Sequence, residues 1–469
     1  MYILHLTRRY LFHRFMPLLS SLSVAISVAM VLVIWSIMGG FLTQFIGSSR
    51  TMLGDVLIEP GVGMAHYQDL LTELRSDPRI GSASATLESL GLLALPNGEL
   101  RTVEVVGIDP ESYDRVTGYT HSLVWHPDAG VGSIRLADRR IDVREAFEAG
   151  RTLRLPGDAT LPGVVVGGAV AGGPGDDGAA ALLPGQAVTL SVLPLDEQHA
   201  GIAGRTFMVA NLLRTGRHDI DSARVLLPLD TLQTMLGYGA GVQRTPEGGE
   251  RRIEPRVTSI MIDAAPGVRD DEVFDATCRA WERFESHHRG QTWPLARMLE
   301  DRRLSLWSNL PWQEVFIGEV RKQIALLLGL FSLVSLTASF LVFSVFWSMI
   351  SEKIRDIGVL RSLGASRLGI TGLYLLYGAG LGALGALLGL ALSWLIVANI
   401  NPIHDGLTRL LGFVLWDPDV YFFSRIPNRI NLLHALVVMT GGVLLSLLGA
   451  LLPAIRAARM DPARALQFE

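Results

Sequence analysis

Long apolar runs without a charged side chain recur along this chain. Runs that lack Asp, Glu, Lys and Arg cover 15–49, 323–351, 368–404 and 430–455. Each is longer than the roughly 20 apolar residues that cross the hydrocarbon core of a bilayer as a helix. The pattern therefore predicts four transmembrane helices. We place them within 1–46, which includes a short N-terminal segment, and at 319–350, 367–400 and 430–456.

The first apolar run could also be a secretory signal peptide, because Arg8, Arg9 and Arg14 precede it. Its apolar region is about twice as long as that of a signal, and 38–50 offers no clear small-residue cleavage site. We expect it to stay in the membrane. Another uncharged run, 178–195, contains two prolines and alternates as AVTLSVL, so it is predicted to be a strand.

Basic residues near the ends of the spans predict the topology. Ten of them lie before the first span, around 351–366 and after the last span, whereas three lie in the 401–429 connection. Both termini and 351–366 are therefore expected in the cytoplasm. The tail at 457–469 is cytoplasmic in this arrangement, and the 401–429 loop lies outside.

The segment 47–318 between the first two spans is too long to be a structureless loop. Short β-like runs such as TVEVVGID and SARVLLPLD mix with helical stretches at 67–75 and 270–287. We expect an extracytoplasmic α/β domain, in which 163–237 is a possible inserted module. The glycine-rich run 172–181 is predicted to be a surface insertion.

Composition agrees with a membrane protein and excludes several kinds of chemistry. The chain is 49% hydrophobic and 18% charged with a net charge of −4, which gives no basic footprint for nucleic acid. Neither lysine stands in a P-loop, and we find no HExxH or GxSxG motif, so no catalytic residue is predicted. The adjacent His287 and His288 would diverge on a helix, so no metal site is predicted either. The single Cys278 cannot form an internal disulfide.

The connection between the second and third spans has the sequence SEKIRDIGVLRSLGAS, at 351–366. Ile354, Ile357, Leu360 and Leu363 recur on one side of a helix, and charged residues occupy the rest. Gly364 can take the left-handed conformation that ends this helix, and Ser366 can cap the next one. Spacing alone fits two interpretations equally: a helix that couples a soluble partner to two spans, or a helix at the membrane surface.

Several stretches resemble the FtsX/MacB/LolC class of ABC-transporter permeases. The resemblance is carried by 351–366 and by the ending PAIRAARMDPARALQFE, at 453–469. The stretches TGRHDIDSARVLLPLD (215–230) and WDPDVYFFSRIP (416–427), together with the first apolar run, are similar to the LolC/LolE branch, the membrane subunits of the lipoprotein-releasing complex. The resemblance implies a helical membrane protein with four spans and a MacB-like periplasmic core domain.

The resemblance also implies a function and partners. Members of this branch extract lipoproteins from the outer leaflet of the bacterial inner membrane and release them to a periplasmic, LolA-like carrier. ATP and Mg are used by a separate LolD-like ATPase dimer, so this chain is expected to bind no cofactor and to be no enzyme by itself. A second permease chain, in a heterodimer or a homodimer, completes the unit.

Within that resemblance, candidate residues can be assigned. The candidates for ATPase coupling are Glu352, Lys353, Arg355, Asp356 and Arg361. The candidates that line a lipid cavity are Phe41, Phe45, Phe331, Phe340 and Phe343, with Phe346 as a further aromatic residue of the second span. The glycines at GxxxG spacing, assigned to helix packing rather than to substrate, are Gly378, Gly382, Gly385 and Gly389. A solvated loop for the first set, and plain packing or lipid contact for the second, are the alternatives.

Three rival functions share part of the pattern. A MacB-like efflux permease has the same architecture, an FtsX-like regulator of cell-wall hydrolases has a smaller outer domain, and a receptor would only bind a ligand. In LolC-like members a hairpin of the outer domain binds the carrier. The stretch 194–207 falls at its expected place but reads as a generic turn.

Overall fold

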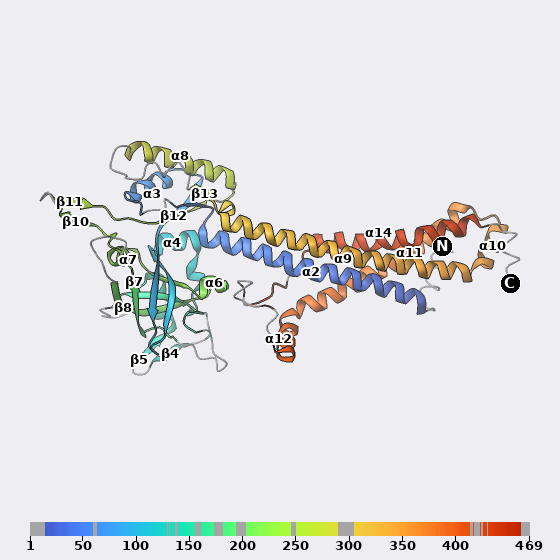
Figure 1. Cartoon of the computed structure of the whole chain (residues 1–469), viewed down its shortest axis with the longest axis horizontal. Helices are drawn as coiled ribbons and strands as arrows, with labels where there is room; N and C mark the ends of the chain where they lie inside the picture. The colour runs from blue at the N-terminus through green and yellow to red at the C-terminus, as the bar shows by residue number, and fades with distance from the viewer. Residues whose placement is uncertain are drawn as a thin grey trace. The chain divides into compact units, whose positions relative to one another are not determined.

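The computed structural model divides into two compact units (Figure 1). The helix unit comprises Met1–Gln44, Phe316–Leu415 and Arg425–Glu469, and the domain unit comprises Phe45–Val315 and Trp416–Ser424. The structure describes residues 15–59, 63–128, 130, 132–136, 139–154, 161–172, 182–193, 203–244, 250–288, 304–412, 416, 423, 425–428 and 430–460. The predicted run 173–181, most of the predicted hairpin (194–202) and the last nine residues of the chain lie outside these ranges.

Four long apolar helices confirm the four predicted membrane spans. They are α2 (Phe15–Leu53), α9 (Pro311–Glu352), α11 (Arg367–Ala398) and α14 (Leu432–Arg459). All four are long and apolar enough to cross a membrane. Helix α9 begins earlier than the predicted span, and its first residue is a proline, which fits the first turn because that turn needs no N–H donor.

Small and polar residues join these helices to one another. The hydroxyls of Ser27 on α2 and Ser335 on α9 are 2.6 Å apart, and Ser339 on α9 donates to the carbonyl of Leu445 on α14 at 2.8 Å. Lipid offers no hydrophobic driving force between helices, so close backbone approach and interhelical hydrogen bonds provide the attraction.

The glycines of α11 stand where it touches two other helices. A Cβ on Gly382 would lie 2.8 Å from the Cβ of Ser446 on α14, and a Cβ on Gly385 would lie 2.7 Å from the carbonyl oxygen of Ser21 on α2. The other two predicted packing glycines make similar contacts. Gly378 faces α14, and Gly389 faces α2. Helix α11 therefore lies against α14 with one pair and against α2 with the other.

Two shorter helices complete the helix unit. Helix α10 (Ile354–Ser362) lies between α9 and α11, and α12 (Ile400–Leu411) follows α11. The segment that contains α12 is predicted as a loop, but Ile400, Ile403, Leu407 and Leu410 recur at helical spacing and form one apolar face. Helix α12 has no buried residue within the described chain. Its exposed apolar face is suited to a membrane interface.

The domain unit is built on one nine-stranded sheet, ordered β13-β1-β12-β2-β3-β9-β6-β8-β7. The strands are β1 (Val56–Ile58), β2 (Ile80–Ala94), β3 (Leu100–Ile108), β6 (Gly163–Gly167), β7 (Ala187–Val192), β8 (Ala203–Leu213), β9 (Arg224–Pro228), β12 (Ser259–Ala264) and β13 (Leu304–Leu306). Strand β7 also pairs with β2, so the six strands from β2 to β7 close into a ring. The pairs β3–β9 and β6–β8 are parallel, and the other pairs are antiparallel.

Helices cover this sheet over separate apolar cores. One core lies among the strands of the ring, and another lies under α3 (Tyr67–Arg75) and α8 (Asp270–His288), which agree closely with the predicted helical stretches. The third core lies under α4 (Pro110–Thr117) and α5 (Val143–Thr152). The remaining elements are α6 (His218–Asp221), α7 (Leu229–Leu236), β4 (Ser133–Leu136), β5 (Arg139–Asp142), β10 (Gly241–Arg244), β11 (Glu250–Ile253), η1 (Tyr119–Ser122) and η3 (Trp307–Asn309).

The segment 163–237, predicted as a possible inserted module, supplies four of the six ring strands. These strands close onto β2 and β3 rather than forming a sheet of their own. Strand β2 is long enough to serve both cores: its first half pairs with β12 and its second half pairs with β7. The two halves of the domain therefore share one continuous backbone.

The first two membrane helices are joined along the chain to two neighbouring strands. Helix α2 ends at Leu53 and the chain enters β1 after Gly54, while η3 leads from β13 to α9. Strands β1 and β13 are antiparallel neighbours, with Val56 opposite Leu306. Gly54 has φ 73°, and a Cβ there would lie 2.6 Å from the carbonyl oxygen of Ile262, so only glycine fits this turn.

A carboxylate cluster fixes this turn. Asp55 is buried, forms an ion pair with Arg50 and accepts from the backbone N–H of Ala264 at 2.8 Å. Burial and the neighbouring Asp55 raise the pKa of Asp263 to about 6. Arg50 also reaches Asp270 at 3.0 Å, which connects the end of α2 to the start of α8.

Replacing Gly385 by alanine should destabilise the helix unit, because the new methyl group would meet the backbone of α2. We expect a loss of about 1–3 kcal/mol in the free energy of unfolding. The matched control is Gly372→Ala on the same helix, where nothing lies within 4 Å, and it should be neutral or slightly stabilising. Thermal unfolding of the full chain in detergent measures both. Equal stability of the two variants would contradict the packing described here.

The raised pKa of Asp263 predicts that the domain loses stability as the pH rises. An unfolded aspartate has a pKa of about 3.9, so between pH 4 and pH 6 the folded chain binds more protons than the unfolded chain. Above about pH 6 the ionised carboxylate is held in a site that disfavours it. The free energy of unfolding of Asp263→Asn, measured relative to the parent chain, should therefore be about 1 kcal/mol higher at pH 7.5 than at pH 4.5. This value is reduced for solvent screening. Denaturant unfolding at both values measures this, and a pH-independent difference would refute it.

Candidate functional site

Tightly closed turns join α10 to α9 and α11. A single residue, Lys353, separates α9 from α10. After α10, Gly364 has φ 93°, its N–H donates to the carbonyl of Arg361 at 3.1 Å, and the N–H of Ala365 donates to that of Leu360 at 3.0 Å. This is a Schellman motif, so the predicted glycine stop is confirmed. Ser366 accepts from the N–H of Gly369 at 3.0 Å, which confirms the predicted cap of α11.

One face of α10 is packed against the long helices. Ile357 is buried in a cluster that joins the ends of three of them. The other members of the cluster are Ile350 of α9, Ile370 of α11, and Ala457 and Ala458 of α14. Leu363, which the spacing places on the same side, is the C-cap of α10 and is 80% exposed.

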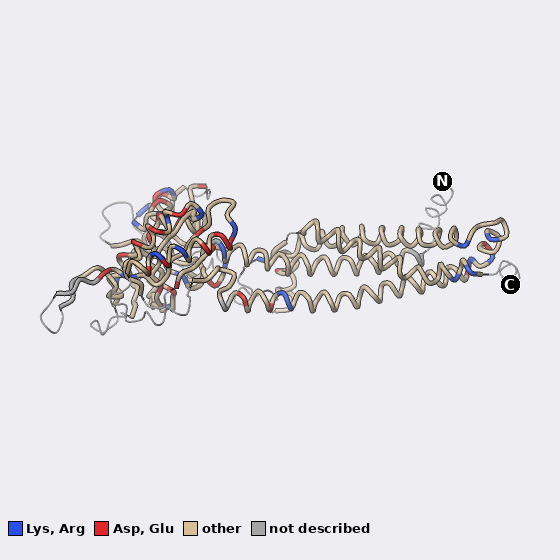
Figure 2. Tube along the Cα trace, turned by 90° about the horizontal axis from the view of Figure 1, so that it is seen from above, with Lys and Arg blue, Asp and Glu red and all other residues tan. Residues whose placement is uncertain are grey.

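The other face of α10 offers charged and apolar groups to solvent. Lys353 pairs with Asp356 at 2.7 Å, and Glu352 and Arg355 are exposed. The Nε of Arg361 is buried and has no hydrogen-bond partner among the described residues. Figure 2 shows charged residues gathered around this connection, whereas the long stretches of helix next to it are almost free of them. The five predicted coupling residues thus lie at one short helix and its N-terminal junction.

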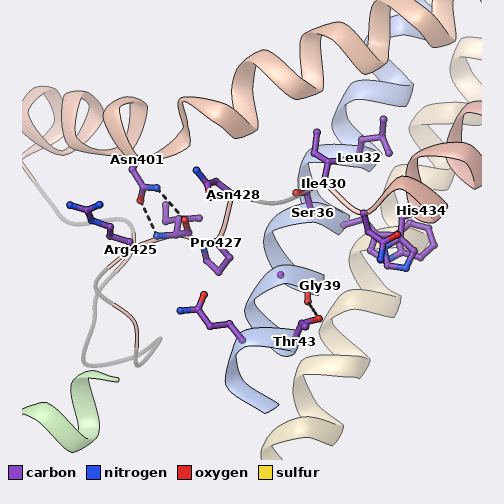
Figure 3. A pocket seen from close by; sticks show the side chains of 15 residues that line it. Leu32, Ser36, Gly39, Thr43, Asn401, Arg425, Pro427, Asn428, Ile430 and His434 are labelled. Carbon is purple, nitrogen blue, oxygen red and sulfur yellow. Dashed lines mark hydrogen bonds between the residues drawn. The ribbon is translucent and has the colours of Figure 1, made fainter. Parts of the chain in front are cut away.

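A cavity of about 680 Å³ lies in the helix unit, beside residues 32–44 of α2 and the first turn of α14 (Figure 3). Its wall combines apolar, aromatic and polar side chains. The lining residues are Leu32, Trp35, Ser36, Gly39, Gly40, Thr43, Gln44, Asn401, Arg425, Ile426, Pro427, Asn428, Ile430, Asn431 and His434.

Two interactions shape this cavity. The rings of Trp35 and His434 stack with centroids 4.3 Å apart. Asn401 holds the opposite wall, because its amide donates to the carbonyl of Ile426 at 3.1 Å and accepts from the Ile426 N–H at 2.9 Å. With Arg425 and several uncharged polar side chains beside apolar and aromatic ones, the cavity suits an amphiphile with an apolar chain and an anionic or polar head.

None of the five phenylalanines predicted for a lipid cavity lines this one. Phe41 is buried and its ring centroid is 6.1 Å from that of Phe316, and Phe45 is buried in the domain unit. On α9, Phe340 is 70% exposed and stacks on Phe343, and Phe331 is half-buried. A lipid-lining role for this set stays a prediction. The residues of the observed cavity were missed because they come from three separate segments of the chain.

Exposed apolar side chains run along α9. They recur at helical spacing, and each is between 56% and 75% exposed: Leu326, Leu330, Leu333, Leu336 and Phe340. A stripe of this kind on a membrane-length helix lies against lipid or against another protein.

A buried arginine fastens two distant segments within the domain unit. Arg217 donates to the hydroxyl of Ser49 at 2.8 Å, lies over the ring of Phe45 at 5.2 Å, and forms an ion pair with Asp219. Its backbone makes an isolated antiparallel bridge with Phe423. The end of α2 and the segment that precedes α14 are thereby held at one point.

Hydrogen bonds within each of the two segments hold the residues around Arg217 and Phe423 in place. The carboxylate of Asp221 accepts from the N–H and the hydroxyl of Thr215 at 2.8 and 2.9 Å, and burial raises the pKa of Asp221 despite these bonds. The indole of Trp416 donates to the carbonyl of Phe423 at 2.9 Å. Sequence alone could not find this site, because the residues that form it are about 170 to 210 positions apart.

Comparison with known proteins agrees with this architecture. Residues 328–462 match the FtsX-like permease C-terminal family. The chain is 23% identical to the lipoprotein-releasing system transmembrane protein LolC of Xylella fastidiosa strain 9a5c, over 98% of this chain and 96% of that protein. It is similar to LolC proteins along nearly its whole length and to FtsX-like permeases in its C-terminal part.

Other LolC/LolE-type relatives give the same result. The LolC of Neisseria meningitidis is 23% identical over 98% of this chain and 95% of that protein. The LolE of Haemophilus influenzae is 33% identical over 28% of this chain and 31% of that protein. Among solved structures, the periplasmic region of MacB from Actinobacillus actinomycetemcomitans aligns at 15% identity over 51% of this chain and 86% of that one, with a TM-score of 0.27.

The arginine contact gives the two stretches similar to LolC/LolE a structural meaning. One stretch, 215–230, supplies Arg217, and the other, 416–427, supplies Phe423. The two stretches are therefore two halves of one contact within the domain unit.

Replacing Arg217 by alanine should destabilise the domain, because it leaves Asp219 without its cation and Ser49 without its donor. We expect a loss of about 1–3 kcal/mol in the free energy of unfolding, since Asp219 is partly exposed. Arg214→Ala, an exposed arginine of the same segment, is the control and should change stability by less than about 0.5 kcal/mol. Denaturant unfolding compares the two, and equal effects would show that the buried contacts contribute nothing.

Proposed function

We propose that this chain is the permease subunit of an ABC transporter that extracts lipoproteins from the outer leaflet of the bacterial inner membrane. The observation that carries the proposal is the similarity to LolC proteins over nearly the whole chain, helices and domain alike. The observed cavity and the exposed face of α10 supply the two surfaces that such a function needs.

In this proposal α10 is the surface on which a separate, LolD-like ATPase dimer acts. The charged residues from Glu352 to Arg361 would contact the ATPase, and ATP and Mg would be bound by that partner. Both termini and α10 are then cytoplasmic and the domain unit is periplasmic, as the basic residues near the span ends favour. Burial of Ile357 among three helix ends makes α10 suited to passing a displacement on to the helix unit.

The cavity beside Trp35 and His434 is proposed to receive part of the lipid anchor. Each CH₂ group of an acyl chain stabilises membrane binding by about 0.8 kcal/mol, so a lipoprotein with several chains does not leave the bilayer without an energy source. An apolar wall beside a cationic residue reduces that cost by offering the chain and the head a partial substitute for lipid.

A second permease chain is proposed to cover the exposed stripe of α9. Two copies of four spans would give the acyl chains an enclosed path that one helix unit does not form alone. A LolA-like carrier would take the lipoprotein on the periplasmic side. The hairpin predicted for that contact is described only from Ala203 onward, where it is the start of β8.

Reversing a charge on α10 should uncouple ATP hydrolysis from release. In liposomes that contain the chain, its partner permease, the ATPase, a lipoprotein and the carrier, Asp356→Lys should lower ATP-dependent release at least tenfold, equivalent to about 1.4 kcal/mol. The reason is that Asp356 is exposed on the face that α10 offers to the ATPase.

The control for this experiment is Glu285→Lys, a charge reversal at an exposed site on α8. It should leave release unchanged. Full release by the Asp356 variant would show that α10 is not the coupling surface, and no release by the parent complex would refute the lipoprotein function itself.

A further inference from the structure

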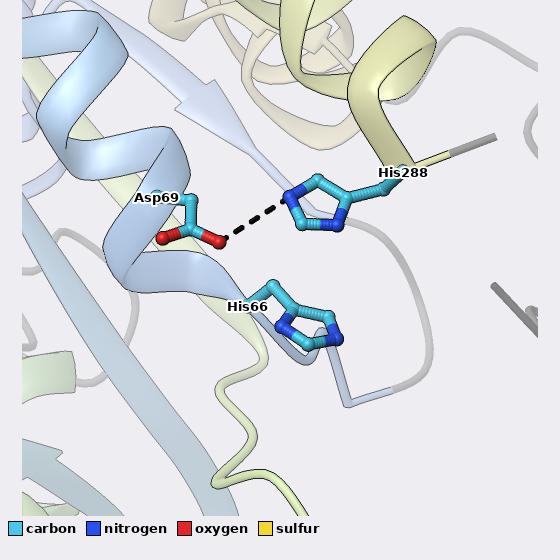
Figure 4. Close-up of side chains that lie close together, drawn as sticks. All are labelled: His66, Asp69 and His288. Atoms are coloured by element: carbon cyan, nitrogen blue, oxygen red, sulfur yellow. Dashed lines mark ion pairs between the residues drawn. The ribbon is translucent and has the colours of Figure 1, made fainter.

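Three side chains that could ligate a metal meet on the surface of the domain unit (Figure 4). His66 immediately precedes α3, Asp69 lies in its first turn, and His288 is the last residue of α8. One potential ligand atom from each lies within 4.8 Å of the others. The Nε2 of His288 is 3.3 Å from a carboxylate oxygen of Asp69, and the rings of the two histidines stack with centroids 4.8 Å apart.

The packing of α3 against α8 holds the three residues in place. Leu70 and Leu74 of α3 share a buried core with Ala280 and Phe284 of α8. The ring of Phe284 also lies 4.7 Å from that of His288, so the imidazole is supported from within the core. The cluster therefore joins the start of one helix to the end of the other at an interface that is already ordered.

His288 carries a polar atom that this packing leaves unsatisfied. Its side chain is only 10% exposed, and its Nδ1 is buried with no hydrogen-bond partner among the described residues. A buried polar atom without a partner lowers stability, because it has lost its hydrogen bonds to water. The Nε2 of His288, 3.3 Å from Asp69, is the nitrogen that can join a shared ligand set, and Nδ1 keeps no partner among the described residues in that arrangement.

His66 has an unusual backbone at the same place. Its φ is 57°, in the left-handed region, and its side chain makes no capping hydrogen bond to α3. Asn, Asp, Ser and Thr are the usual N-caps because their side chains accept from the first turn. A histidine here does not cap the helix, but it brings its ring over that of His288.

We propose that His66, Asp69 and His288 bind a divalent transition metal, with Zn²⁺ as the best-fitting ion. Two imidazoles and a carboxylate are ligands that suit Zn²⁺ and its neighbours, whereas Mg²⁺ and Ca²⁺ prefer oxygen alone. Ligand atoms around a tetrahedral zinc ion lie about 3.4 Å apart at bond lengths of about 2.1 Å. The distance between Asp69 and the Nε2 of His288 is 3.3 Å, close to this value, and a nitrogen of His66, within 4.8 Å of both ligand atoms, would have to move closer to share the ion.

Three protein ligands leave the fourth position of a tetrahedral zinc ion open. Solvent can reach that position, because the side chain of Asp69 is 63% exposed. Bound metal would fasten the end of α8 to the start of α3 and so stiffen the face of the domain that these helices cover. The inference does not depend on the proposed transport function. The sequence predicts no metal here, because only the adjacent pair His287–His288 stands out in it. His66 and His288 are brought together solely by the fold.

Metal binding by the full chain tests this proposal. The chain, purified in detergent with a tag that contains no histidine and freed of metal with a chelator, is titrated with Zn²⁺ in a calorimeter. Bound zinc is then counted by mass spectrometry after desalting. We expect one Zn²⁺ per chain, and at least a hundredfold weaker binding for His288→Ala and for His66→Ala, because each loses one of three ligands.

Two controls make the result decisive. His287→Ala removes an exposed neighbouring histidine outside the cluster and should bind Zn²⁺ as the parent does. Asp69→Asn, an exposed and conservative change, should weaken binding at least tenfold while its metal-free thermal unfolding matches that of the parent, which separates loss of a ligand from loss of the fold. The proposal is overturned if the parent binds no zinc, if His287→Ala loses as much affinity as His288→Ala, or if the cluster variants bind normally.

Discussion

The pairing of β1 with β13 is the interaction on which the rest of this structure depends. Two of the four passages of the chain between its helix unit and its domain run through α2 and α9, and these helices are joined to two strands that share one set of backbone hydrogen bonds. A shift of one helix along its axis therefore has to shift the other or break the ladder. Gly54 and the Arg50–Asp55 pair leave no flexible residue between α2 and the sheet.

Arg217 adds a further attachment to the same domain. Through Phe423 it holds the segment that leads to α14, and through Ser49 it holds the end of α2. In the helix unit, Ile357 joins the ends of α9, α11 and α14 to α10. Both units thus have a point where several segments converge, and α2 and α9 are the continuous elements that leave one unit and enter the other.

The bilayer explains why so much of this fold could be predicted. A span has to be long, uncharged and helical, so its position can be recognised from the sequence. The helix end at Gly364 and the cap at Ser366 are also local signals. The contacts of Arg217, the cavity beside Trp35 and the pair His66–His288 depend on segments that meet only after folding. Helix α12 is a different case: its apolar spacing was present in the sequence but was assigned to a loop.

The closed turn at Gly364 has a consequence for how efficiently work can be delivered. A flexible hinge bends when the element on one side is displaced, so the element on the other side moves less. In this turn the carbonyls of Leu360 and Arg361 accept hydrogen bonds, and α11 begins at Arg367. Under the proposed function, a displacement of α10 would reach α11 through this hydrogen-bonded turn rather than through a free hinge.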